Sequence, residues 1–102
     1  MSIRKQFLKT RPFCKVTFRL TKEEIGDARC VHITGAFNDW EKPGLPMKAF
    51  KNGSFTVSLD LETGKDHAFR YLVDEQHWMN DPEADKQIPS GFAGSNNFVV
   101  TV

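Results

Sequence analysis

The sequence predicts an all-β sandwich of immunoglobulin-like size, with six to eight short and mainly antiparallel strands. Three observations support this fold class. Several short segments alternate between apolar and polar residues, as half-buried strands do. Turn-forming residues separate these segments at regular intervals, as expected for strands joined by tight turns. Finally, the sequence contains no convincing helix beyond a single short turn.

Length and composition indicate one folded domain with a single modest core. The chain has 102 residues, a net charge of +1 and abundant aromatic residues. Such a small charge gives no reason to expect nucleic acid or a membrane surface as a partner. No apolar run approaches the roughly 20 residues that span a bilayer, and residues 1–12 lack the apolar segment of a secretory signal. We therefore expect a cytoplasmic protein.

The two cysteines are too few and too scattered for a disulfide framework or a zinc site. Cys14 belongs to an alternating segment, so it is expected to be a small buried thiol. A bridge to Cys30 becomes an alternative only if the protein is exported.

The first third of the chain divides into an arm, a strand and a turn. Residues 1–12 carry four basic residues and no acid, which predicts a basic arm that is either loose or docked on a partner. The sandwich is predicted over residues 13–102. Its first strand is Cys14–Leu20, where apolar and polar residues alternate strictly. Residues 21–24 have the spacing of a capping box, which predicts one short helical turn.

The second strand, at residues 30–35, leads into the corner Phe37-Asn38-Asp39-Trp40, from which Trp40 is expected to project at the surface. Asn52-Gly53 is a strong hairpin signal. In the strand that contains Arg70, the alternation directs Phe69 and Tyr71 to one face and Arg70 to the other. The remaining strands are predicted at 47–50, 54–60, 67–73 and 97–102, with a short segment around Trp78 and a loop-like stretch over 82–95.

The sequence argues against an enzyme. It has no nucleophile elbow, no phosphate-binding glycine loop and no paired-histidine metal motif, and its three histidines lie far apart. Asp74, Asp81 and Asp85 could supply an acid–base pair for glycoside hydrolysis. They occupy turn positions, however, where aspartate commonly serves local hydrogen bonds. We therefore expect a binding module that needs neither a metal nor a cofactor.

The exposed aromatic and amide residues suggest a ligand with flat faces and many hydroxyl groups. Trp40 and Trp78 lie in polar segments, and the C–H faces of sugar rings pack against such aromatic systems. Arg70 and Asn96 carry side chains that hydrogen-bond hydroxyl groups. Each residue also has an ordinary structural interpretation: Trp78 as a core ring, Arg70 as a solvated strand residue, and Asn96 as a turn cap.

At these positions the chain resembles a known family. The shared pattern consists of Val31–Trp40, the strand Phe69–Asp74, Trp78 with the following Asn80-Asp81-Pro82, and Asn96-Asn97. It is similar to the family 48 carbohydrate-binding modules, which include the glycogen-binding modules of AMP-activated protein kinase β subunits and the isoamylase early-set domains. The resemblance covers about residues 14–102, nearly the whole chain.

The resemblance implies an early-set β-sandwich that binds α-1,4-glucans such as glycogen, starch or maltooligosaccharides. It implies that Trp40 and Trp78 stack on glucose rings. Arg70 then stands at the position of a lysine, and Asn96 at that of an asparagine, which hydrogen-bond sugar hydroxyls in the family. Phe92 falls where the family has a leucine beside the sugar.

The sequence departs from the family pattern in three places. Arg70 replaces the lysine, and the two side chains are not interchangeable where a planar fork meets hydroxyl groups. Glu75 stands where the family usually has glycine. One additional residue separates Arg70 from Trp78, and a shift of one residue in a strand would turn Trp78 to the opposite face.

An alternative function is a protein-interaction or regulatory sandwich. Family members are usually fused to a catalytic barrel or a kinase partner segment, whereas this sequence predicts a standalone domain. Such a module could act in trans on a glycogen-metabolising enzyme or pair with a second copy of itself. Its exposed aromatic residues would then lie in an interface, and the basic arm would dock.

Overall fold

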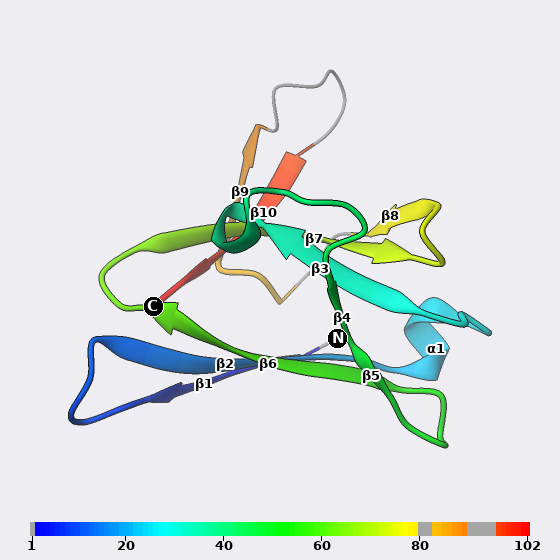
Figure 1. Ribbon diagram of the computed structural model, residues 1–102, viewed down its shortest axis with the longest axis horizontal. Coiled ribbons are helices and arrows are strands. Elements are labelled where there is room, and N and C mark those ends of the chain that lie inside the picture. The colour runs from blue at the N-terminus through cyan, green and yellow to red at the C-terminus, as the bar shows by residue number, and fades with distance from the viewer. Residues whose placement is uncertain (1, 80–82, 90–95) are drawn as a thin grey trace.

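The computed structural model describes residues 2–79, 83–89 and 96–102, the side chains of residues 89 and 96 excepted (Figure 1). Within these residues, ten strands form two antiparallel sheets that pack on one another. The predicted all-β sandwich is therefore confirmed. Fewer strands were expected because Ser2–Phe7 and Lys86–Pro89 were not predicted as strands, and because one strand was predicted at 47–50 where two short ones form.

The first sheet contains four strands in the order β1-β2-β6-β5. Their bounds are Ser2–Phe7 for β1, Phe13–Leu20 for β2, Phe55–Glu62 for β6 and Lys48–Ala49 for β5. The predicted alternation in β2 is confirmed, because Cys14, Val16, Phe18 and Leu20 are fully buried. Ser2–Phe7, expected within a basic arm, pairs instead with β2 along its whole length, and Ile3 packs against the core. A basic composition does not prevent this pairing, because main-chain groups form the ladder.

The second sheet has the order β4-β3-β7-β10-β9, with β8 also paired to β7. Its strands are β3 (Val31–Gly35), β4 (Leu45–Pro46), β7 (Asp66–Val73), β8 (His77–Met79), β9 (Lys86–Pro89) and β10 (Asn96–Thr101). The whole stretch 82–95 was predicted as loop, and that prediction is wrong for β9. Its polar residues and its proline gave no strand signal, but β9 is an edge strand, where proline is tolerated.

The single strand predicted at 47–50 is also wrong. β4 pairs with β3 in the second sheet, whereas β5 pairs with β6 in the first. Met47 lies between them, is buried, and donates its main-chain N–H to Val31 O at 2.8 Å. The chain therefore passes from one sheet to the other at Met47.

Aromatic rings from both sheets form the centre of the core. Phe18 of β2 lies 5.1 Å from Phe69 and 6.4 Å from Tyr71, measured between ring centroids, and both partners belong to β7. All three rings are fully buried. Their tilted and edge-to-face arrangements are the favoured geometries for aromatic pairs. This packing fixes which face of β7 points inward, and therefore which face points to solvent.

The predicted turns agree with the structure. The Glu24 carboxylate accepts hydrogen bonds from the Thr21 main-chain N–H (3.0 Å) and hydroxyl (2.8 Å), at the start of helix α1 (Lys22–Ile25). At the predicted hairpin, Gly53 has φ +85°, a conformation that favours glycine. Asn52 accepts a hydrogen bond from the main-chain N–H of Ser54 at 3.0 Å, which stabilises the same turn.

Candidate functional site

A tight corner after β3 positions Trp40. The Asn38 side-chain oxygen accepts a hydrogen bond from the Gly35 N–H at 2.9 Å, within the short 3-10 helix η1 (Ala36–Asn38) and its cap. The Thr34 hydroxyl, fully buried, donates to the main-chain oxygen of Glu41 at 2.8 Å. The Trp40 N–H in turn donates to Gly35 O at 2.9 Å. These bonds close the corner and leave the Trp40 side chain 36% exposed.

The corner requires glycine at its first position for steric reasons. A Cβ atom added to Gly35 would lie 2.2 Å from the main-chain oxygen of Ala68 and 2.8 Å from the Phe37 ring. The next residues also adopt an unusual backbone, because Asp39 and Trp40 both have φ +57°. Non-glycine residues rarely occupy this region, and such strain often marks functional positions.

Arg70 and Trp78 lie on the same outer face of the second sheet. Trp78 pairs with Leu72 across the β7–β8 hairpin, and Leu72 is two residues from Arg70 on β7, so the three side chains share one face. The Arg70 guanidinium carbon lies 5.2 Å from the centroid of the Trp78 ring. The additional residue between Arg70 and Trp78 therefore does not turn the tryptophan inward. The hairpin turn absorbs it, with Asp74 and Glu75 at φ +51° and +57°.

Lys42 connects the Trp40 loop to Trp78. Its ammonium nitrogen lies 5.3 Å from the centroid of the Trp78 ring, so the loop that follows Trp40 reaches β8. Trp78 is 37% exposed, nearly the same fraction as Trp40. Lys42 was missed at the sequence level, because a lysine in a polar loop gives no signal of a distant ring.

The structure does not describe the remaining predicted site residues fully. Asn96 begins β10 and pairs with Pro89 through the backbone, but its side chain is outside the described atoms. Phe92 lies outside the described residues. The roles of both therefore stay predictions.

Two of the three carboxylates considered for catalysis hold the fold together. Asp74 Oδ1 accepts hydrogen bonds from the main-chain N–H groups of Cys30 (3.0 Å) and Arg29 (2.7 Å), and these bonds lower the pKa of Asp74. Burial raises the pKa of Asp85, but hydrogen bonds from Lys5 Nζ (2.8 Å) and the Thr101 N–H (2.7 Å) outweigh it and lower the pKa overall. Asp81 lies outside the described residues.

Over residues 2–79, 83–89 and 96–102, no three metal-binding side chains gather at one place. In the same residues, no helix has the length and apolar character needed to cross a bilayer.

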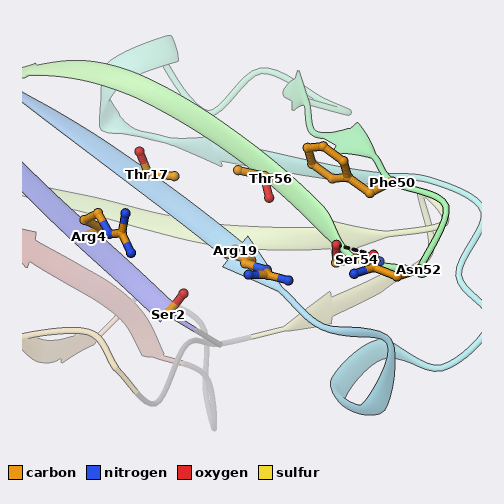
Figure 2. A pocket seen from close by; sticks show the side chains of 8 residues that line it. All are labelled: Ser2, Arg4, Thr17, Arg19, Phe50, Asn52, Ser54 and Thr56. Atoms are coloured by element: carbon orange, nitrogen blue, oxygen red, sulfur yellow. Dashed lines mark hydrogen bonds between the residues drawn. The ribbon is translucent and has the colours of Figure 1, made fainter.

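The outer face of the first sheet carries a second feature, a shallow groove of about 370 Å³ (Figure 2). It is lined by Ser2, Arg4, Thr17, Arg19, Phe50, Asn52, Ser54 and Thr56. Arg4 and Arg19 come from the adjacent strands β1 and β2, and neither forms an ion pair with a described residue. Sequence analysis missed this groove, because its residues come from separate strands that only the sheet brings together.

Comparison with known proteins identifies the family. The sequence profile of a family described as the glycogen recognition site of AMP-activated protein kinase matches residues 18–102. The chain belongs to this family. The glycogen recognition family is a non-catalytic type of carbohydrate-binding domain, and Trp40, Arg70 and Trp78 all lie within the matched residues.

Individual members of this family are similar over most of the chain. The 5'-AMP-activated protein kinase subunit beta-1 of Sus scrofa is 35% identical over 74 residues, which cover 72% of this chain and 56% of that protein. The corresponding subunits of Rattus norvegicus and Homo sapiens are each 34% identical over 74 residues, covering 72% of this chain and 25% of theirs. The aligned part of the chain thus spans only about a quarter to a half of these relatives.

Proposed function

We propose that the chain binds α-1,4-glucans without transforming them, using Trp40 and Trp78 as stacking platforms and Arg70 as a hydrogen-bond donor. One observation carries this proposal. Arg70 and Trp78 share the outer face of the second sheet, and Lys42 links them to the loop that presents Trp40. Membership of a glycogen recognition family supports the same ligand class.

The chemistry of these groups suits a glucan. The C–H faces of glucose rings pack against the half-exposed indole rings, while the planar Arg70 fork donates to neighbouring hydroxyl groups. Phe92 and Asn96 are proposed to add further contacts to the sugar. An open platform buries little of an oligosaccharide, so we expect dissociation constants on the order of micromolar to millimolar.

Calorimetric titration with maltoheptaose tests this function. We expect Trp40→Ala to weaken binding by about tenfold or more, because the substitution removes a stacking platform. Phe50→Ala is the matched control, since Phe50 is an exposed aromatic residue in the groove of the first sheet. Equal affinity for the wild-type and Trp40→Ala proteins would contradict the assignment.

A second candidate function is association with a protein partner through the groove of the first sheet. Arg4 and Arg19 give this groove positive charge, which favours an acidic surface on a glycogen-metabolising enzyme or on a second copy of the chain. The similar proteins are named as kinase subunits, and hence as parts of an assembly. A solution mass above one chain that falls in Arg19→Glu would support self-association, and a mass of one chain would exclude it.

A further inference from the structure

Two cations lie close to one tryptophan ring in the proposed site. Lys42 Nζ and the Arg70 guanidinium carbon are 5.3 and 5.2 Å from the Trp78 centroid. Both distances lie within the range of cation–π attraction. Lys42 comes from the loop after Trp40 and Arg70 from the central strand β7, so different parts of the fold bring positive charge to this ring.

Neither cation is neutralised by a described carboxylate. Lys5, Lys65 and Lys86 each pair with an acidic side chain, whereas Lys42 and Arg70 form no ion pair in the described parts of the chain. The Arg70 Nε atom is buried and has no described hydrogen-bond partner. Asp74, on the same hairpin as Trp78, already accepts hydrogen bonds from main-chain amides.

A neutral glucan does not account for this charge. Hydroxyl groups can accept hydrogen bonds from one guanidinium fork, but they cannot neutralise two positive charges beside the same ring. Two positive charges beside one ring repel each other, and an anionic ligand group would relieve that repulsion. Arginine matches phosphate oxygens through its planar fork, and lysine binds phosphate as a compact point charge.

We propose that the Trp78 end of the site prefers α-glucans whose glucose units carry phosphate monoesters. This inference rests on the proposed glucan-binding function and specifies its ligand further. Trp78 packs against the sugar ring, and Lys42 and Arg70 bind the phosphate oxygens. The added attraction is electrostatic and acts between partly exposed charged groups, so salt screens it. The preference for phosphorylated glucan therefore decreases at high salt, whereas binding of neutral glucan changes little.

Calorimetry with phosphorylated maltooligosaccharides, and with the same preparation after phosphatase treatment, tests the proposal. The wild-type protein should bind the phosphorylated ligand about tenfold more tightly at low salt, the effect typical of a charge-assisted hydrogen bond. Lys42→Met should lose most of this preference, so that its affinities for the two preparations become nearly equal. Lys51→Met is the matched control, because it removes the same charge from an exposed turn of the first sheet and should keep the preference.

The possible outcomes separate the two claims. Equal affinity for both ligands would overturn the phosphate preference and leave glucan binding intact. Loss of the preference in Lys51→Met as well would assign it to net charge rather than to Lys42. Binding of inorganic phosphate alone as tightly as the phosphorylated glucan would overturn the role of the sugar platform. Failure to bind either glucan would overturn the proposed function together with this inference.

Discussion

At the scale of single residues, the geometry of the site depends on a few polar atoms in the corner after β3. The Thr34 hydroxyl and the Asn38 amide oxygen hold the main chain on either side of Trp40. Trp40 itself is 36% exposed and has φ +57°, and it follows directly after this hydrogen-bonded segment. The buried corner therefore determines where the ring projects.

Replacing Thr34 by valine tests this dependence. The substitution keeps the shape of the side chain but leaves the Glu41 carbonyl without its 2.8 Å donor. We expect a loss of about 1–2 kcal/mol in the free energy of unfolding, measured with urea, because a partly buried acceptor is left unpaired. Maltoheptaose affinity should fall as well, since the corner loosens around Trp40.

Thr17→Val is the matched control for this experiment. Thr17 also forms a hydroxyl hydrogen bond, to Ser58 Oγ at 2.8 Å, but on the exposed face of the first sheet. Water can replace that bond, so the control should cost about 0.5 kcal/mol or less. Equal losses for the two variants would show that the Thr34 bond has no special role in the corner.

Asp74 makes stability depend on pH. Hydrogen bonds from the main-chain amides of Cys30 and Arg29 lower the pKa of Asp74 in the folded state. The ionised carboxylate therefore stabilises the fold fully at any pH above its pKa in the unfolded chain, about 3.9. That contribution is lost as the pH falls through the folded pKa. Compared with the wild type, Asp74→Asn should therefore be less stable at pH 7, and the difference should shrink in acid.

Urea unfolding midpoints of both proteins, measured from pH 7 to pH 2, check this prediction. The comparison is made between variants because the pKa values of Glu62, Asp66 and Asp85 are also lowered, and all three contribute to acid sensitivity in the wild type. A constant difference between the two proteins across this pH range would contradict the assigned role of Asp74.

At the scale of structural elements, the β7–β8 hairpin determines on which face of the second sheet Trp78 lies. The turn contains two consecutive residues with positive φ, Asp74 and Glu75, and these absorb the residue that the family pattern lacks. Glu75 has φ +57° where the family usually has glycine, so the turn contains backbone strain that glycine would relieve.

Glu75→Gly is accordingly expected to stabilise the fold by about 1 kcal/mol in thermal or urea unfolding, with no loss of glucan affinity. Gln76→Gly is the control, because the backbone of Gln76 does not have positive φ and glycine there only adds flexibility to the unfolded chain. A destabilising effect of Glu75→Gly equal to that of the control would contradict this account of the turn.

The sequence predicted well those strands in which apolar and polar residues alternate as the two faces of the strand require. β2 and β7 alternate between core and solvent, so their faces could be assigned before the structure was known. β1 and β9 were missed because both are edge strands. An edge strand can form its main-chain pairs without a regular apolar face, so its sequence need show no alternation. The separation of β4 from β5 was missed because a buried Met47 fits one continuous strand as well as a crossing point between two strands. Only the strand pairing shows that the chain passes from one sheet to the other there.

At the scale of the whole molecule, the two sheets expose chemically different surfaces. The second sheet presents Trp78 and Arg70 on its outer face, next to the Trp40 loop. The first sheet presents a groove with two arginines and several hydroxyl groups (Figure 2). The sequence indicated Trp40, Arg70 and Trp78 through their polar surroundings and the family resemblance, but strand register had to establish that Arg70 and Trp78 share a face. Lys42 gave no signal in the sequence.

The most direct test of the account is to locate the glucan on one of these two surfaces. Maltoheptaose titrated into ¹⁵N-labelled protein should shift both indole N–H signals and the amide signals of residues 38–42, 70–72 and 77–79. Amides of the first sheet around Thr17 and Thr56 should remain unchanged. Shifts concentrated at the first-sheet groove, or no shifts at millimolar ligand, would contradict the claim that the outer face of the second sheet binds α-glucan.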